Sequence, residues 1–208
     1  MKWFRIPKES SPRPKTGKYY SDWKEHLSKE GKEQCVYCTI NINSFGGIRN
    51  FHVEHYRPKA EDKFPKLEHE YTNLFFACSI CNGFKSDDWK NEPSPKLDNE
   101  SYPDPSKVDY SDFLFLDAVQ LVDSKFITGK YIIQKIFLNR PQLILERKSF
   151  FLHQILRKEM QNLKDIFIEL QKQNIQIPSQ FAIKLIEIMD LVIEEKYINP
   201  YTEAQIRR

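Results

Sequence analysis

The sequence contains no run of about 18 uncharged apolar residues, the minimum that a transmembrane helix needs. Residues 1–18 also lack the apolar segment of a secretory signal, so we expect a cytoplasmic protein without a membrane partner. Glycine is scarce, with 6 residues against 12 prolines, which excludes collagen-like and Gly-linker chains. The net charge of +3 is too small to indicate nucleic-acid binding by itself.

The chain does contain enough apolar material for a sizeable core. Of its 208 residues 40% are hydrophobic, including 15 Phe and 10 Tyr, which excludes a disordered chain. Irregular segments dominate the first half and helical patterns the second, so we expect an α+β fold. We divide it into a basic N-terminal arm with a short helix, a core, a Pro-rich linker and a helical C-terminal region that could dock a partner, at residues 1–32, 33–90, 91–110 and 111–208.

The N-terminal arm is the most basic part of the chain. Residues 1–18 carry six lysines or arginines against Glu9 alone. Such an arm could neutralise phosphates, or it could be a solvated tail.

Local patterns predict several elements. Residues 20–29 are typical of a short helix, and residues 51–55 alternate as a strand does. Gly129 is expected to interrupt the apolar pattern of the C-terminal region. Apolar stripes over residues 152–170 and 181–192 predict two amphipathic helices folded back on each other.

All four cysteines lie in two Cys-x2-Cys pairs, Cys35/Cys38 and Cys78/Cys81. The two-residue gap lets both thiolates of a pair reach one ion from a tight turn, and two pairs complete a tetrahedral Zn²⁺ site. The alternatives are four unconnected core cysteines or a redox pair, and the latter would need a βαβ pattern that neither pair has. A site closed by four thiolates is structural, so any chemistry lies elsewhere.

Polar residues between and after these pairs indicate where that chemistry lies. Residues 52–59 read His-Val-Glu-His-Tyr-Arg-Pro-Lys, Asn73-Leu74 follows, and Asn82 comes directly after the last cysteine. Cys-x2-Cys, Glu-His, Asn-Leu and Cys-x2-Cys-Asn-x2-Lys, in this order, resemble the HNH endonucleases. The resemblance covers residues 33–88 and implies a small, zinc-stapled ββα-metal (His-Me finger) core.

The resemblance also implies a role for each matching residue. His55 would be the general base that takes a proton from the water attacking the scissile phosphate. Glu54, where the family often has Asp, and Asn82 would bind a divalent ion, and their oxygen donors favour Mg²⁺ or Mn²⁺. Asn73 would hold the loop and orient His55.

The roles of the other polar residues nearby stay open. Arg57, Lys59 and Lys85 could contact phosphate, although Arg57 and Lys59 could equally form a solvated face. His52 shares a strand face with Glu54 and is either an additional metal ligand or a structural histidine.

A narrower resemblance extends beyond the core. Residues 131–147 look like the stretch after the nuclease core in HNH proteins of the Septu antiphage systems, and Tyr20-Ser-Asp-Trp-Lys24 fits the same group. This resemblance implies an effector nuclease that is controlled by an ABC-type ATPase partner, a pair that some retron systems also use. Its substrate would be nucleic acid, with DNA favoured and RNA still open.

Two other functions compete with this one. A zinc-knuckle module could bind nucleic acid or protein without cutting. Such a module would not need a base beside a second ion site, yet Glu54, His55 and Asn82 together indicate both. A stand-alone restriction-type HNH enzyme would not require the C-terminal helices. The sequence therefore favours a partner-controlled nuclease.

Overall fold

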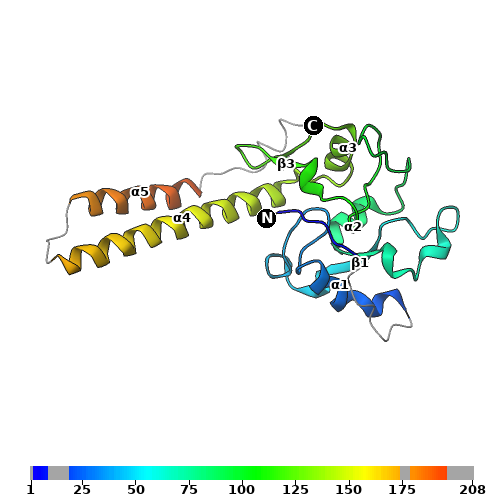
Figure 1. Cartoon of the computed structure of the whole chain (residues 1–208), viewed down its shortest axis with the longest axis horizontal. Coiled ribbons are helices and arrows are strands. Elements are labelled where there is room, and N and C mark those ends of the chain that lie inside the picture. The colour runs from blue at the N-terminus through cyan, green and yellow to red at the C-terminus, as the bar shows by residue number, and fades with distance from the viewer. Residues whose placement is uncertain (1, 9–18, 174–178, 196–208) are drawn as a thin grey trace. The chain divides into compact units, whose positions relative to one another are not determined.

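The computed structural model describes residues 2–8, 19–173 and 179–195, and it divides into two units, residues 1–143 (unit 1) and 144–208 (unit 2) (Figure 1). Helices combine with small antiparallel sheets, which confirms the predicted α+β class. Residues 9–18 of the expected basic arm, and residues 174–178 and 196–208 of the expected helical region, lie outside the described residues.

The centre of unit 1 is a two-stranded antiparallel sheet followed by a helix. Strand β1 (Phe51–His55) pairs with β2 (Leu74–Cys78), and α2 (Ser79–Lys85) follows β2 directly. Every residue of β2 is buried, and the ring of Phe51 stacks on that of Phe76 at 4.6 Å between centroids. The strand predicted over residues 51–55 is confirmed, and the three elements form a ββα unit.

The N-terminal segment packs on this ββα unit. A 3₁₀ turn (Tyr20–Trp23) leads into α1 (Lys24–Glu30), so the predicted short helix is confirmed apart from its first turn. Lys8 is buried, forms an ion pair with Glu30 and lies 4.5 Å above the ring of Tyr71. This lysine of the arm is therefore neither a solvated charge nor free to contact phosphate.

Residues 91–110, which we expected to be a linker, lie inside unit 1. Tyr102 is fully buried and donates a hydrogen bond to Asp88 at 2.7 Å. The backbone N–H of Ile6 donates to the carbonyl of Pro105 at 2.8 Å. The prolines make the segment irregular, but its aromatic side chains hold it in the core.

A second small sheet and a helix complete unit 1. Strands β3 (Phe115–Leu116) and β4 (Val122–Asp123) pair antiparallel, and α3 (Ile127–Lys135) follows. Our expectation that Gly129 interrupts the pattern is wrong, because Gly129 lies inside α3. A Cβ atom there would lie 2.0 Å from Oγ of Ser124, so the glycine allows close packing instead of breaking the helix.

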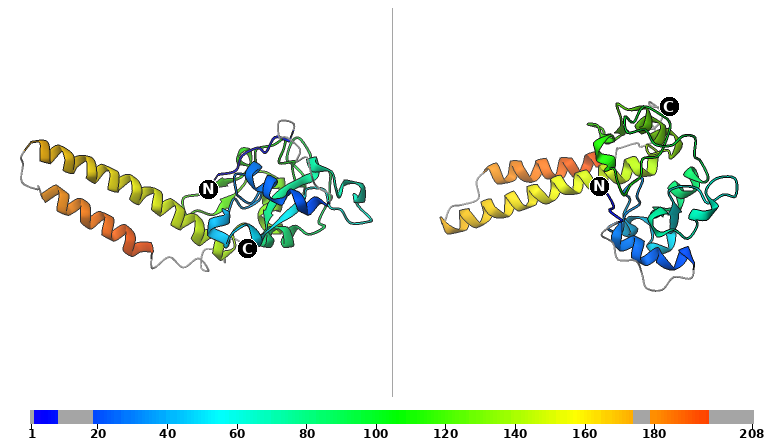
Figure 2. Two further views of the ribbon diagram at one scale, coloured as in Figure 1. Left: turned by 90° about the horizontal axis from the view of Figure 1, so that it is seen from below. Right: turned by 45° about the vertical axis from the view of Figure 1, so that its right-hand side comes forward.

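Unit 2 contains the predicted pair of helices. Helix α4 (Pro141–Lys172), which begins at the end of unit 1, and α5 (Ser179–Glu195) run side by side in opposite directions (Figures 1 and 2). Lys184 on α5 pairs with Glu159 on α4 at 2.8 Å, and Leu163 and Ile188 are buried. No helix in the described part of the chain is long and apolar enough to cross a membrane.

The packing of α3 generates a stability prediction. Gly129→Ala should lower the free energy of unfolding by about 1–3 kcal/mol, because the added methyl group overlaps Ser124. Gly83→Ala in α2 is the matched control: nothing lies within 4 Å of its Cβ position, so it should raise the stability by about 0.5–1 kcal/mol. Urea unfolding of both variants measures the difference, and unchanged stability of Gly129→Ala would contradict the packing argument.

Candidate functional site

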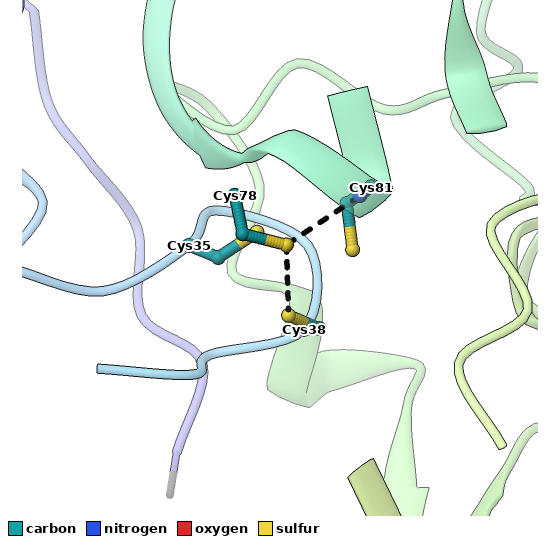
Figure 3. Close-up of side chains that lie close together, drawn as sticks. All are labelled: Cys35, Cys38, Cys78 and Cys81. Atoms are coloured by element: carbon teal, nitrogen blue, oxygen red, sulfur yellow. Dashed lines mark hydrogen bonds between the residues drawn. The ribbon is translucent and has the colours of Figure 1, made fainter. Parts of the chain in front are cut away.

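The four cysteines meet in one buried cluster. Cys35 and Cys38 come from the loop after α1, Cys78 ends β2 and Cys81 lies in the first turn of α2 (Figure 3). All four Sγ atoms lie within 4.8 Å of one another, and those of Cys38 and Cys78 are 3.8 Å apart. Tetrahedral zinc with Zn–S bonds of about 2.3 Å requires sulfur separations of about 3.8 Å, so the cluster fits this ion.

Backbone N–H groups hold the two cysteine turns in place through hydrogen bonds. The N–H of Thr39 donates to the carbonyl of Cys35 at 2.9 Å and closes the first turn, and the N–H of Val36 ties this turn to the carbonyl of Phe76 in β2 at 2.9 Å. At the second turn the N–H of Cys81 donates to Sγ of Cys78 at 3.4 Å. A bound ion would therefore link the loop after α1 to the junction of β2 and α2. The four cysteines would fill all of its coordination positions.

A second group of polar residues lines a cavity of about 610 Å³ beside β1. Five of the residues singled out in the sequence meet there: His52, Glu54, His55, Lys59 and Asn82. Tyr20 and Lys24, the ends of the segment that fits the Septu-type group, also line it, and so does Arg49, which the sequence patterns had not distinguished. The cavity thus combines imidazole, carboxylate, amide and cationic groups.

The carboxylate of Glu54 is buried and held from two sides. Its Oε1 accepts a hydrogen bond from the hydroxyl of Tyr37 at 3.0 Å and pairs with Nζ of Lys85 at 2.7 Å. Its Oε2 lies 2.5 Å from Nδ2 of Asn82. Because the O and N of an amide are assigned from their surroundings, a turned Asn82 amide would place two oxygen donors side by side.

Lys85 does not lie where we expected it. Its side chain is fully buried, and Nζ also donates to the backbone carbonyl of His55 at 2.8 Å. The expected phosphate contact is therefore not available to it in this structure, because the ammonium group faces Glu54 instead of solvent. Sequence reasoning missed the role of Tyr37. Its position between Cys35 and Cys38 was the one feature of the sequence that could have indicated it.

The imidazole of His55 is fixed in one orientation. Nε2 lies 3.0 Å from the carbonyl oxygen of Glu68, and because a carbonyl only accepts, Nε2 carries the proton. Among the described residues Nδ1 has no hydrogen-bond partner, so it is the basic nitrogen. Burial lowers the pKa of His55, and the charge of Lys59 adds to this effect, so the ring favours its neutral form.

Asn73 holds the loop that follows β1. Its Oδ1 accepts from the backbone N–H of Arg57 at 2.8 Å, and its Nδ2 donates to the carbonyls of Arg57 at 3.0 Å and Leu67 at 3.2 Å. Its own carbonyl accepts from the N–H of Tyr56 at 2.9 Å. The amide thus fastens the chain directly after His55, whereas the imidazole ring itself is bound by Glu68.

The two remaining candidate cations lie apart. Nζ of Lys59 donates to the hydroxyl of Tyr20 at 3.0 Å and to Glu68 at 2.7 Å, at the edge of the cavity that contains His55. The guanidinium group of Arg57 instead pairs with Glu92 at 2.6 Å and lines another cavity, of about 890 Å³. The structure therefore brings Lys59, but not Arg57, to the candidate site.

A comparison with protein families agrees with this geometry. Residues 35–88 match the family model of the HNH endonucleases, a region that includes all four cysteines and the residues around Glu54, His55 and Asn82. No curated protein and no solved structure gives a significant match to the chain.

The cluster predicts the metal content of the protein. Purified chain should contain about one tightly held zinc, and Cys78→Ser should lose both the metal and the fold, since a structural zinc site contributes roughly 10 kcal/mol or more. His69→Ala, which removes an exposed imidazole outside the cluster, should keep the zinc. Elemental analysis and thermal unfolding measure both effects, and well-folded protein without zinc would contradict the assignment.

Proposed function

We propose that the chain is a metal-dependent HNH endonuclease that hydrolyses phosphodiester bonds of nucleic acid. The observation that carries this proposal is the meeting of His55, Glu54 and Asn82 in one cavity, inside the region that matches the HNH family model. The four-cysteine cluster is a closed site and takes no part in the chemistry. We place the protein in the cytoplasm, where thiols remain reduced and available as metal ligands.

His55 is the general base in this proposal. Its Nε2–H is bound to the carbonyl of Glu68, which leaves Nδ1 to accept a proton from a water molecule. The water oxygen attacks phosphorus, the bond to the leaving oxygen breaks, and that oxygen takes up a proton. The fixed ring orientation saves the entropy of aligning the base during the reaction.

Glu54 and Asn82 would hold Mg²⁺ or Mn²⁺, and such an ion would supply positive charge next to the leaving oxygen. Two protein donors suit Mg²⁺, since this ion commonly keeps several waters and binds substrate phosphate. Tyr37 and Lys85 occupy Oε1 of Glu54 and leave Oε2 on the side of Asn82. We therefore propose that Tyr37 and Lys85 orient the carboxylate of Glu54.

Cations around the same cavity suit a polyanionic substrate. Lys24, Arg49 and Lys59 line it together with His52. Within the described part of the chain neither Lys24 nor Arg49 forms an ion pair, so both charges are available for phosphate. We propose that they position the nucleic-acid backbone, and that His52, which is exposed, supports the ion or the phosphate. These contacts would suit DNA or RNA, and we favour DNA.

The catalytic proposal is tested at His55. His55→Ala should lower the rate of plasmid nicking in the presence of Mg²⁺ or Mn²⁺ by about 10²–10⁴-fold, because it removes the base. The zinc content should stay at the wild-type level, since His55 contributes no sulfur ligand. His153→Ala, an exposed position on α4, is the matched control and should cut normally. Cleavage by His55→Ala at the wild-type rate, of either DNA or RNA, would refute the mechanism.

We further propose that an ABC-type ATPase controls this nuclease, as in the Septu-type systems that residues 131–147 resemble. Support comes from apolar side chains that remain exposed on α4 and α5, which is typical of a surface that binds a protein partner. They are Leu145, Phe150, Phe151, Met160, Ile166, Ile168, Ile183, Leu185 and Ile186.

Ile183 and Ile186 allow a sharp test, because they are 56% and 57% exposed and three positions apart on α5. The double variant Ile183→Ser, Ile186→Ser should fail to co-purify with the ATPase encoded beside the gene of this chain. Asn162→Ser, Lys164→Ser on α4 changes exposed polar residues instead and should bind normally. Equal recovery of the ATPase with both variants, or the lack of such a neighbouring gene, would argue against this control.

A further inference from the structure

Arg140, the residue directly before α4, reaches the cysteine cluster from a distant part of the chain. It is buried, with 5% of its surface exposed. Nη2 lies 3.6 Å from Sγ of Cys81 and 3.8 Å from Sγ of both Cys38 and Cys78, and Nη1 lies 3.6 Å from Sγ of Cys81. One guanidinium group thus faces three of the four sulfur atoms.

The backbone around Arg140 keeps the guanidinium group in this place. Nη1 also lies 3.4 Å from the carbonyl oxygens of Ile136 and Phe137. No carboxylate in the described part of the chain pairs with Arg140. The two buried lysines of unit 1 differ in this respect, since Lys8 pairs with Glu30 and Lys85 with Glu54. The sulfur cluster is therefore the anionic partner that justifies a buried arginine.

The guanidinium group of Arg140 offsets negative charge on a metal-loaded cysteine cluster. Four thiolates around one divalent ion carry a net charge of −2, and burial of that charge in an apolar core is costly. An arginine that always carries its proton reduces the net charge to −1. Its N–H groups also supply charge-assisted hydrogen bonds to sulfur, and outer groups of this kind tune the strength of metal ligands.

We propose that Arg140 is a positioning residue of the metal cluster: it retains the ion by compensating the charge of Cys38, Cys78 and Cys81. The contact also couples metal loading to the start of α4. When the ion and the thiolates are in place, Arg140 is paired. The same guanidinium group contacts the carbonyls of Ile136 and Phe137, so the segment between α3 and α4 is tied to the cysteine cluster.

The test compares three full-length variants. Arg140→Met removes the charge and the N–H donors at similar length, and Arg140→Lys keeps the charge with fewer donors. Asn139→Ala is the matched control: Asn139 is buried next to Arg140, and its side-chain amide bonds both backbone groups of Val122, at 2.8 and 2.9 Å. Each protein is prepared with zinc and, separately, with cobalt(II) in its place.

Two readouts separate a metal role from a general structural role. Zinc transfer to a chromogenic chelator should be about 10–100-fold faster from Arg140→Met than from wild type, with Arg140→Lys in between. The thiolate-to-cobalt absorption band should shift in Arg140→Met, because the sulfurs lose their N–H partners. Asn139→Ala should lower the thermal midpoint without shifting this band.

Wild-type zinc release and an unshifted band in Arg140→Met would overturn the proposal. The proposal would equally fail if Asn139→Ala released zinc as fast as Arg140→Met, because the effect would then reflect a loosened fold. If Arg140→Met does not fold, Arg140→Lys decides: faster release with a shifted band supports the proposal, and wild-type behaviour overturns it. None of these measurements depends on nuclease activity.

Discussion

The cysteine cluster is the constraint on which the rest of unit 1 depends. Two strands of five residues, β1 and β2, are too small to form a stable sheet by themselves. A metal held by Cys35, Cys38, Cys78 and Cys81 would fasten the loop after α1 to the point where β2 becomes α2. Since the candidate site lies on β1 and α2, the same metal would help to fix the distance between Glu54 and Asn82.

A buried ion pair between Glu54 and Lys85 also supports the candidate site. Glu54 and Lys85 are both removed from water, and such a pair is tolerated only when its remaining hydrogen-bonding capacity is used. Tyr37 and Asn82 meet that need on the glutamate, and the carbonyl of His55 meets it on the lysine. The outcome is a carboxylate with one fixed orientation beside the proposed base, so the residues that stabilise the core also arrange the site.

Residues 89–143, which follow the family match, belong to the same unit as the matched region. Tyr102 and Tyr131 both donate hydrogen bonds to Asp88, at the end of the matched region. Arg140 closes the cluster from still further along the sequence. Residues 89–143 therefore stabilise the matched region from outside, and a minimal nuclease core cut from this chain would lose part of its support.

The sequence by itself determined the features whose signals are local: the cysteine pairs, the Glu-His strand, Asn82 directly after the last cysteine, and the paired amphipathic helices. Spacing and periodicity carry that information because neighbours in the chain share one turn, strand or helix face. Only the tertiary structure decided that Lys85 points inward to Glu54, that Arg57 faces Glu92, and that Gly129 lies within α3. These outcomes depend on which distant groups share a buried space, and so does the contact between Arg140 and Cys81, 59 positions apart. Burial makes an unpaired charge costly, and that cost, which no local pattern expresses, selects the partner.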